Sequence, residues 1–167
     1  MAKITRIGYG QVEPNHLSAQ RTGQIYAQLP AVDSIEVLEN GQFVKYDYAS
    51  GKVNFTGEGE FMLVLNEVKL YDERETYKDF AMKKENYVGK VMVPRVFKTN
   101  VGDIYTTNMV DSEIEMVAGT TKLAPSTAEG KEGILTTAGA DAEMIWKVVK
   151  VYTLADGQAA VKLQRIK

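Results

Sequence analysis

The sequence predicts a mainly β protein, built as a small antiparallel barrel or sandwich with an extended N-terminal arm and at most one short helix. Three observations predict this class. Short apolar runs recur along the chain, and glycine-containing turn signals separate them. Two of these turns, Asn40-Gly41 and Asp156-Gly157, carry the residues that tight hairpins favour.

Length and composition indicate one domain that is stable without disulfides or bound metal ions. The chain has 167 residues, no cysteine, one histidine and a net charge of −2. A chain of this size buries about 68–70% of its unfolded surface, so its core needs no disulfide or metal. Basic and acidic residues are interspersed, so we expect no nucleic-acid ligand. We also expect no secretion signal and no membrane segment, because no apolar run is long enough.

Residues 1–30 are interpreted as the extended arm, and residues 31–167 as a single β domain. The arm contains eight apolar side chains, but they follow neither a helical nor a strand period. Glycines and prolines interrupt it. So many apolar side chains are unfavourable in water, so we expect the arm to dock onto another surface.

The first expected hairpin turns at Asn40-Gly41, because both residues tolerate the positive φ angles of a type I′ turn. Pairing across this turn places Val37 opposite Val44 on one face and Glu36 opposite Lys45 on the other. Apolar and opposite-charge pairs therefore agree on one register.

Further elements follow in order. Residues 49–52 form a turn that leads into a strand, and the apolar run 61–65 is short enough for a buried strand. Residues 72–87 are charge-rich with some apolar residues at helical spacing, which indicates a short helix. Strand signals resume over 90–97, where Pro94 suggests a sheet edge or a bulge.

The last third of the sequence contains two more strand candidates, 101–107 and 113–117, followed by a second hairpin. Between the 113–117 strand candidate and this hairpin, residues 119–141 are rich in Gly, Thr, Ala and Ser and are expected to form a long flexible loop. If Asp156-Gly157 is a two-residue hairpin loop, Tyr152 faces Val161 and the face that carries Trp146 is buried.

No set of residues indicates catalysis, a cofactor or a metal. His16 is the only histidine, and it lies in the arm, where no triad or metal cluster can be recognised. The acidic segments 111–115 and 72–73 lack the spacing of a calcium loop. Gly8-Tyr9-Gly10 lacks the third glycine of a dinucleotide-binding loop. We therefore expect a protein that is not an enzyme and has neither cofactor nor metal.

The arm, the Asn40-Gly41 hairpin, the segment 101–108 (VGDIYTTN) and the terminal hairpin 154–161 (LADGQAAV) together resemble the small capsid decoration proteins of tailed bacteriophages. The resemblance implies a structural virion protein on the capsid exterior, made in the host cytoplasm. Its partner would be the major capsid protein, whose neighbouring subunits it would bridge, and it could also associate with itself, for example as a trimer.

In that family an N-terminal arm commonly adds to a sheet edge of the capsid, where main-chain hydrogen bonds supply affinity. Candidate partner-binding residues of the arm are Ile4, Arg6, Ile7, Tyr9, Val12 and Tyr26. On this interpretation, deleting residues 1–12 abolishes capsid binding but leaves the β domain folded.

Three alternatives remain open. A phage tail or head-completion protein would form a ring of its own copies. A carbohydrate- or ligand-binding β module would use an exposed Trp146 and tyrosines as a stacking platform. A hydrolase with paired carboxylates would need a concave pocket, which a sequence cannot show.

Overall fold

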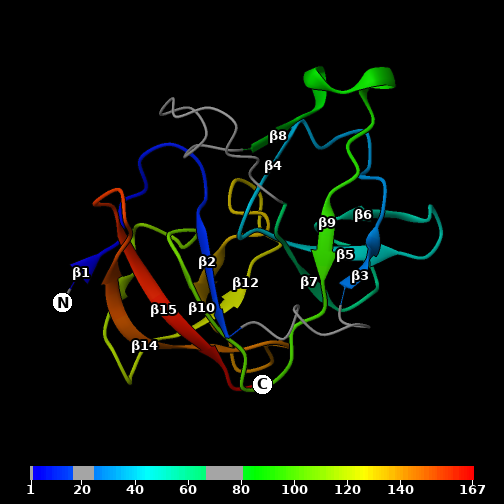
Figure 1. Cartoon of the computed structure of the whole chain (residues 1–167). Coiled ribbons are helices and arrows are strands. Elements are labelled where there is room, and N and C mark those ends of the chain that lie inside the picture. Colours follow the sequence, from blue (N-terminus) through cyan, green and yellow to red (C-terminus); the bar gives the residue numbers. More distant parts are fainter. Residues whose placement is uncertain (1, 17–24, 67–80) are drawn as a thin grey trace.

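A computed structural model of the chain describes residues 2–16, 25–66 and 81–167 (Figure 1). The described chain is mainly β, and its strands pair antiparallel, as the sequence predicts. The strands of the first half are β1 (Ala2–Lys3), β2 (Val12–His16), β3 (Ile25–Gln28), β4 (Val37–Glu39), β5 (Phe43–Asp47), β6 (Lys52–Asn54), β7 (Phe61–Val64) and β8 (Ala81–Lys83). Those of the second half are β9 (Arg95–Phe97), β10 (Ile104–Thr107), β11 (Glu115–Met116), β12 (Lys122–Pro125), β13 (Leu135–Thr137), β14 (Trp146–Thr153) and β15 (Ala159–Arg165).

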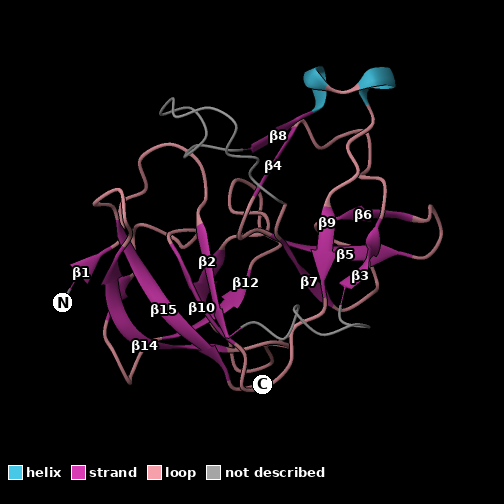
Figure 2. Ribbon diagram, in the orientation of Figure 1, coloured by secondary structure: helices cyan, strands magenta, loops and turns pink. Residues whose placement is uncertain are grey.

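Two larger sheets and two small ribbons make up the described fold (Figure 2). A six-stranded sheet has the order β13-β12-β14-β15-β10-β2, and it curls around its concave face. A five-stranded sheet has the order β3-β9-β7-β5-β6. The ribbons are β1-β11 and β4-β8. None of the helical turns in the described part of the chain has the length and apolar character that a membrane-spanning helix needs.

The centre of the five-stranded sheet is buried on both faces. All four residues of β7 are buried, and successive side chains of a strand point to opposite faces. Leu63 belongs to a core cluster shared with the six-stranded sheet, whereas Met62 and Val64 belong to a second cluster. The uninterrupted apolar run of β7 therefore separates two cores, and its prediction as a buried strand is confirmed.

The Asn40-Gly41 turn exists, but its predicted hairpin is wrong. Strand β5 has β6 on one edge and β7 on the other, so no edge is left for β4. Gly41 instead donates its N–H to the Val64 carbonyl, with φ +92° and a backbone too close to Thr107 for a side chain. Strand β4 turns away and pairs with β8. The turn predicted over residues 49–52 does form the β5-β6 hairpin.

The arm expected over residues 1–30 is integrated into the body wherever the structure describes it. Strand β1 pairs with β11, β2 with β10 and β3 with β9. Ile4 is 0% exposed within the first core cluster. The apolar residues of this region follow no single period, because its short strands belong to different sheets and each has its own register.

The loop expected over residues 119–141 contains two strands, β12 and β13, which pair with each other. Leu123 and Leu135 are fully buried. Backbone hydrogen bonds also close the turn between these strands. The Ser126 N–H donates to the Ile134 carbonyl, and the Gly133 N–H donates to the Ser126 carbonyl. These short strands have a weak pattern of their own and depend on pairing with the rest of the sheet.

Two further sequence expectations need correction. Residues 72–80 of the expected helix lie outside the described residues, while 81–83 form β8 and are followed by two 3₁₀ turns, η3 (Lys84–Asn86) and η4 (Val88–Lys90). Pro94 does not mark a sheet edge: it immediately precedes β9, an internal strand, so its missing N–H lies outside the ladder.

The terminal hairpin β14-β15 is confirmed, with a register one residue from the expected one. Thr153 pairs with Ala159, and Tyr152 pairs with Ala160 rather than Val161. Residues 154–158 therefore form the loop, and a bulge between Val148 and Lys150 shifts the pairing. Trp146 is 0% exposed, as the sequence predicts.

Candidate partner-binding surface

A short ribbon rises from the body of the molecule, and we call it the projection: strands β4 and β8 together with residues 84–94 (Figure 1). Leu38 of β4 pairs with Met82 of β8, and both side chains are buried in the second core cluster with Met92. Lys84 reinforces the ribbon through its backbone bond to the Glu36 carbonyl and an ion pair with the Glu36 side chain at 3.2 Å. The base of the projection is thus packed.

The tip of the projection is a tight turn built from η3 and η4. Gly89 has φ +68°. Lys90 has φ +55° and is the only non-glycine residue with a positive φ among the residues that the structure describes. The Lys90 N–H donates to the Tyr87 carbonyl at 2.9 Å, which closes the turn. A lysine in this conformation is uncommon, and such strain tends to occur at functional positions.

Exposed apolar side chains gather on the projection. Of the nine large apolar side chains that are exposed in the described residues, four lie here: Val37, Val88, Val91 and Val93. Val88 at the tip is completely exposed. Val91 and Val93 alternate with the buried Met92 and therefore face outward together. Apolar side chains gathered on a polar surface mark interaction sites more often than scattered ones do.

The N-terminal segment, residues 4–12, lies at the foot of the projection. The Arg6 guanidinium forms an ion pair with the Glu39 carboxylate of β4 at 2.6 Å, and the Gly10 N–H donates to the same oxygen at 2.6 Å. The Lys83 ammonium of β8 lies 5.2 Å from the centroid of the Tyr9 ring. A hydrogen bond to Tyr9 raises the pKa of Lys83.

The other side of the N-terminal segment is fixed to the β14-β15 loop. The Ile7 N–H donates to the Gln158 side chain at 2.9 Å, and the Gln11 side chain donates to the Asp156 carboxylate at 2.7 Å. Burial opposes ionisation of Asp156, but hydrogen bonds from Gln11 and Gln158 outweigh it and lower the pKa of the carboxyl. The segment thus connects the projection to the six-stranded sheet.

The structure brings together only some of the partner-binding residues that the sequence suggested. Arg6, Ile7 and Tyr9 lie together at the foot of the projection, and Ile7 is 71% exposed. Ile4 is enclosed in the core, and Val12 is half-buried against it. Tyr26 lies in β3 of the other sheet, and its side chain is outside the described part of the structure.

The valines of the projection were missed by sequence reasoning. Their signal was present as apolar residues around Gly89 in a charge-rich stretch, but residues 90–93 were interpreted as a strand. In the structure these residues carry no ladder pairing, so Val91 and Val93 are left exposed rather than packed.

Two of the carboxylates weighed as calcium ligands, Asp111 and Glu113, have a lysine as their partner, and the 72–73 pair lies outside the described residues. Lys131 places its ammonium 2.7 Å from Asp111 and 2.9 Å from Glu113. Burial opposes ionisation of Asp111, but the hydrogen bond from Lys131 outweighs it and lowers the pKa of the carboxyl. Among the described residues, no three His, Cys, Asp or Glu side chains converge as metal ligands. His16 lies in β2, and the structure does not describe its side chain.

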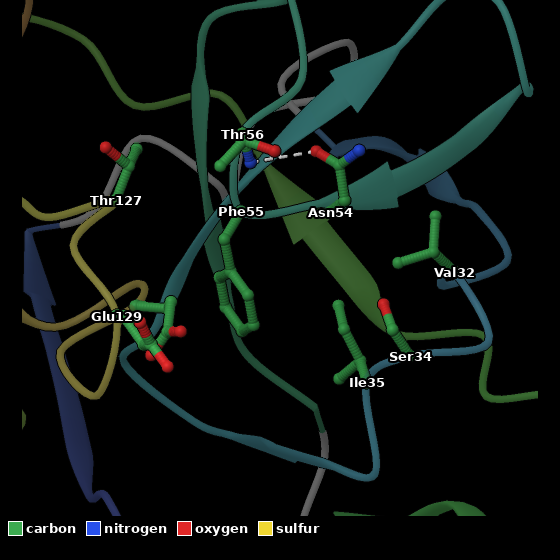
Figure 3. Close-up of a pocket in the computed structure, with 9 residues that line it drawn as sticks. Val32, Ser34, Ile35, Asn54, Phe55, Thr56, Thr127 and Glu129 are labelled. Carbon is green, nitrogen blue, oxygen red and sulfur yellow. Dashed lines mark hydrogen bonds between the residues drawn. The ribbon is translucent and has the colours of Figure 1, made fainter.

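A pocket of about 350 Å³ opens where the two sheets meet (Figure 3). Its lining comes from the segment before β4, from the end of β6 and the residues after it, and from the β12-β13 turn: Val32, Ser34, Ile35, Asn54, Phe55, Thr56, Thr127, Glu129 and Glu132.

Trp146, the residue considered for a stacking platform, is buried. Its ring packs against that of Tyr105, with 4.8 Å between the ring centroids.

The fold and these surfaces define a two-sheet antiparallel β protein with a projection that carries four exposed valines. Comparison with known proteins adds no relative: no family model, no curated protein and no solved structure matches the chain.

Proposed function

We propose that the chain is a non-enzymatic structural protein that binds another protein through its projection. The observation that carries this proposal is the gathering of Val37, Val88, Val91 and Val93 on one protruding element. Full burial of an exposed valine contributes about 1.5–3 kcal/mol. Val88 can gain that much, whereas the other three valines are 38–43% exposed and gain correspondingly less, so the contact depends on all four together. The packed base of the projection reduces the ordering that binding would cost.

The sequence resemblance gives this binding role a specific setting. We propose a decoration protein that sits on the outer surface of a phage capsid, contacts the major capsid protein and reinforces the shell by bridging its subunits. The projection replaces the N-terminal arm as the proposed contact, with Ile7 beside it. A protein of this kind is made in the host cytoplasm and carried on the virion.

The proposal is tested by co-assembly with capsid shells. The chain is mixed with shells of the major capsid protein encoded by the same genome, and bound protein is measured after sedimentation. The double variant V88D/V91D should lose most binding, because burying two carboxylates is unfavourable. The matched control V101D/V149D changes two exposed valines outside the projection, in the turn before β10 and in β14, and it should bind normally.

Three results would contradict the proposal. Equal binding of V88D/V91D and the unchanged protein would remove the projection from the contact. A genome without a major capsid gene would contradict the virion role. A large ring of this chain in a solution mass measurement would favour the tail or head-completion alternative over decoration.

A further inference from the structure

The pocket between the two sheets combines an apolar wall with uncompensated negative charge. Val32, Ile35 and Phe55 form the apolar part of its lining, and Glu129 and Glu132 supply the carboxylates. Figure 3 shows Phe55 in the middle of the pocket, with Ile35 on one side of the ring and Glu129 on the other. A volume of about 350 Å³ is at the small end for ligand sites, which suits one long side chain better than a large ligand.

The walls of the pocket are held in place before any ligand binds. A Cβ at Gly133, where φ is +74°, would lie 2.8 Å from the Phe55 ring, so the ring rests directly on the backbone of the β12-β13 turn. The Gly133 carbonyl accepts the Phe43 N–H at 2.8 Å, and the Glu132 carbonyl accepts the Gln42 side chain at 3.1 Å. These bonds fix the turn against β5.

Nearby lysines do not neutralise the two glutamates. Lys131, in the same turn, binds Asp111 and Glu113 on the other side. Lys52, at the start of β6, pairs with Asp33 at 3.2 Å. Neither Glu129 nor Glu132 forms an ion pair with any residue that the structure describes. The pocket therefore lacks a positive charge of its own.

We propose that this pocket binds a basic side chain, lysine or arginine, that a partner protein presents. The aliphatic stem of such a side chain fits against Val32, Ile35 and the Phe55 ring, and its cationic head meets the carboxylates. The aromatic ring adds a favourable contact with the cation. This inference rests on the proposed function, because Ile35 leads directly into β4, which brings the pocket to the base of the projection.

The test is an NMR titration of the full chain with Nα-acetyl-lysine-N-methylamide and with its arginine counterpart. Amide signals of Phe55, Thr56 and Thr127 should shift and saturate. The neutral probe Nα-acetyl-norleucine-N-methylamide has the same stem without the charge, and it should bind at least about fivefold more weakly.

The double variant E129Q/E132Q should weaken binding of the basic probes by at least about fivefold. A matched control, E115Q/D141N, removes the same charge from two exposed carboxylates outside the pocket and the projection and should leave binding unchanged. Equal binding of the neutral probe, insensitivity to E129Q/E132Q, or absence of shifts at the pocket residues would each overturn the inference.

The two proposals fail separately. The titration needs no capsid, so probe binding without capsid binding would contradict only the proposed function. Capsid binding that depends on the projection, together with no response to the basic probes, would contradict only the pocket inference.

Discussion

At the scale of single residues, the core contains two polar atoms without visible partners. The Tyr105 hydroxyl and the Trp146 indole N–H are buried and have no hydrogen-bond partner among the described residues. Burial raises the pKa of Tyr105 well above its ordinary value. An unpaired buried polar group is costly, whereas the ring itself packs edge-on against Trp146.

The substitution Y105F should therefore leave stability unchanged or raise it by up to about 1 kcal/mol. Urea unfolding followed by tryptophan fluorescence measures the difference, with Y152F at a half-buried strand position as the control. A loss of more than about 1 kcal/mol in Y105F would show that the hydroxyl has a bonding partner.

Asp156 should make stability depend on pH. Its pKa in the folded chain lies below the ordinary 3.8, so the unfolded chain takes up the proton first as pH falls. The contribution of Asp156 is therefore present above about pH 4 and is lost as pH drops through the lower folded-state pKa.

The variant D156N should flatten this part of the stability profile, and it should cost about 1 kcal/mol at neutral pH through weaker hydrogen bonds to Gln11 and Gln158. Urea unfolding from about pH 2 to pH 6 compares the two proteins. Parallel profiles would rule out this role for Asp156.

At the scale of elements, the N-terminal segment is a structural part of the fold. Ile4 is fully buried whereas Ile7 is 71% exposed, and the two lie in one segment. I4A should cost about 2–5 kcal/mol because it leaves a cavity, and I7A should cost less than about 0.5 kcal/mol. Equal effects in thermal or urea unfolding would contradict this assignment.

The same observation changes what deletion of residues 1–12 can show. The sequence suggested that the truncated domain would stay folded, but the deletion removes Ile4 from the core and β1 from its pairing with β11. Loss of capsid binding after that deletion would follow from unfolding alone. Surface substitutions on the projection avoid this ambiguity.

The elements that the sequence predicted correctly depend on local chemistry. The residue 49–52 turn joins neighbouring strands, β7 is apolar throughout, and β14-β15 turns at Asp156-Gly157. The elements that it missed depend on distant partners. Asn40-Gly41 could not show that β5 already has two neighbours, and β12 and β13 acquire their strand form from pairing.

The candidate site was predictable only in part, for the same reason. Arg6, Ile7 and Tyr9 were chosen for their place in an irregular N-terminal region, and the structure brings them to the foot of the projection. The projection itself forms because β4 pairs with β8 across a long stretch of sequence. No local pattern encodes that pairing, so the exposure of its valines could not be foreseen.

At the scale of the whole molecule, the fold consists of layers that carry one protruding element. The five-stranded sheet lies between two core clusters, one shared with the six-stranded sheet and the other with the base of the projection. The N-terminal segment ties the projection to the β14-β15 loop through Arg6 and Ile7. The projection is therefore connected to both sheets.

Electron cryomicroscopy of capsid shells saturated with the chain tests most directly the proposal that the projection binds the shell. The map should place the projection, with η3, η4 and Val88 at its tip, against the shell surface. A map in which the shell contacts another face while the projection points into solvent would contradict the claim.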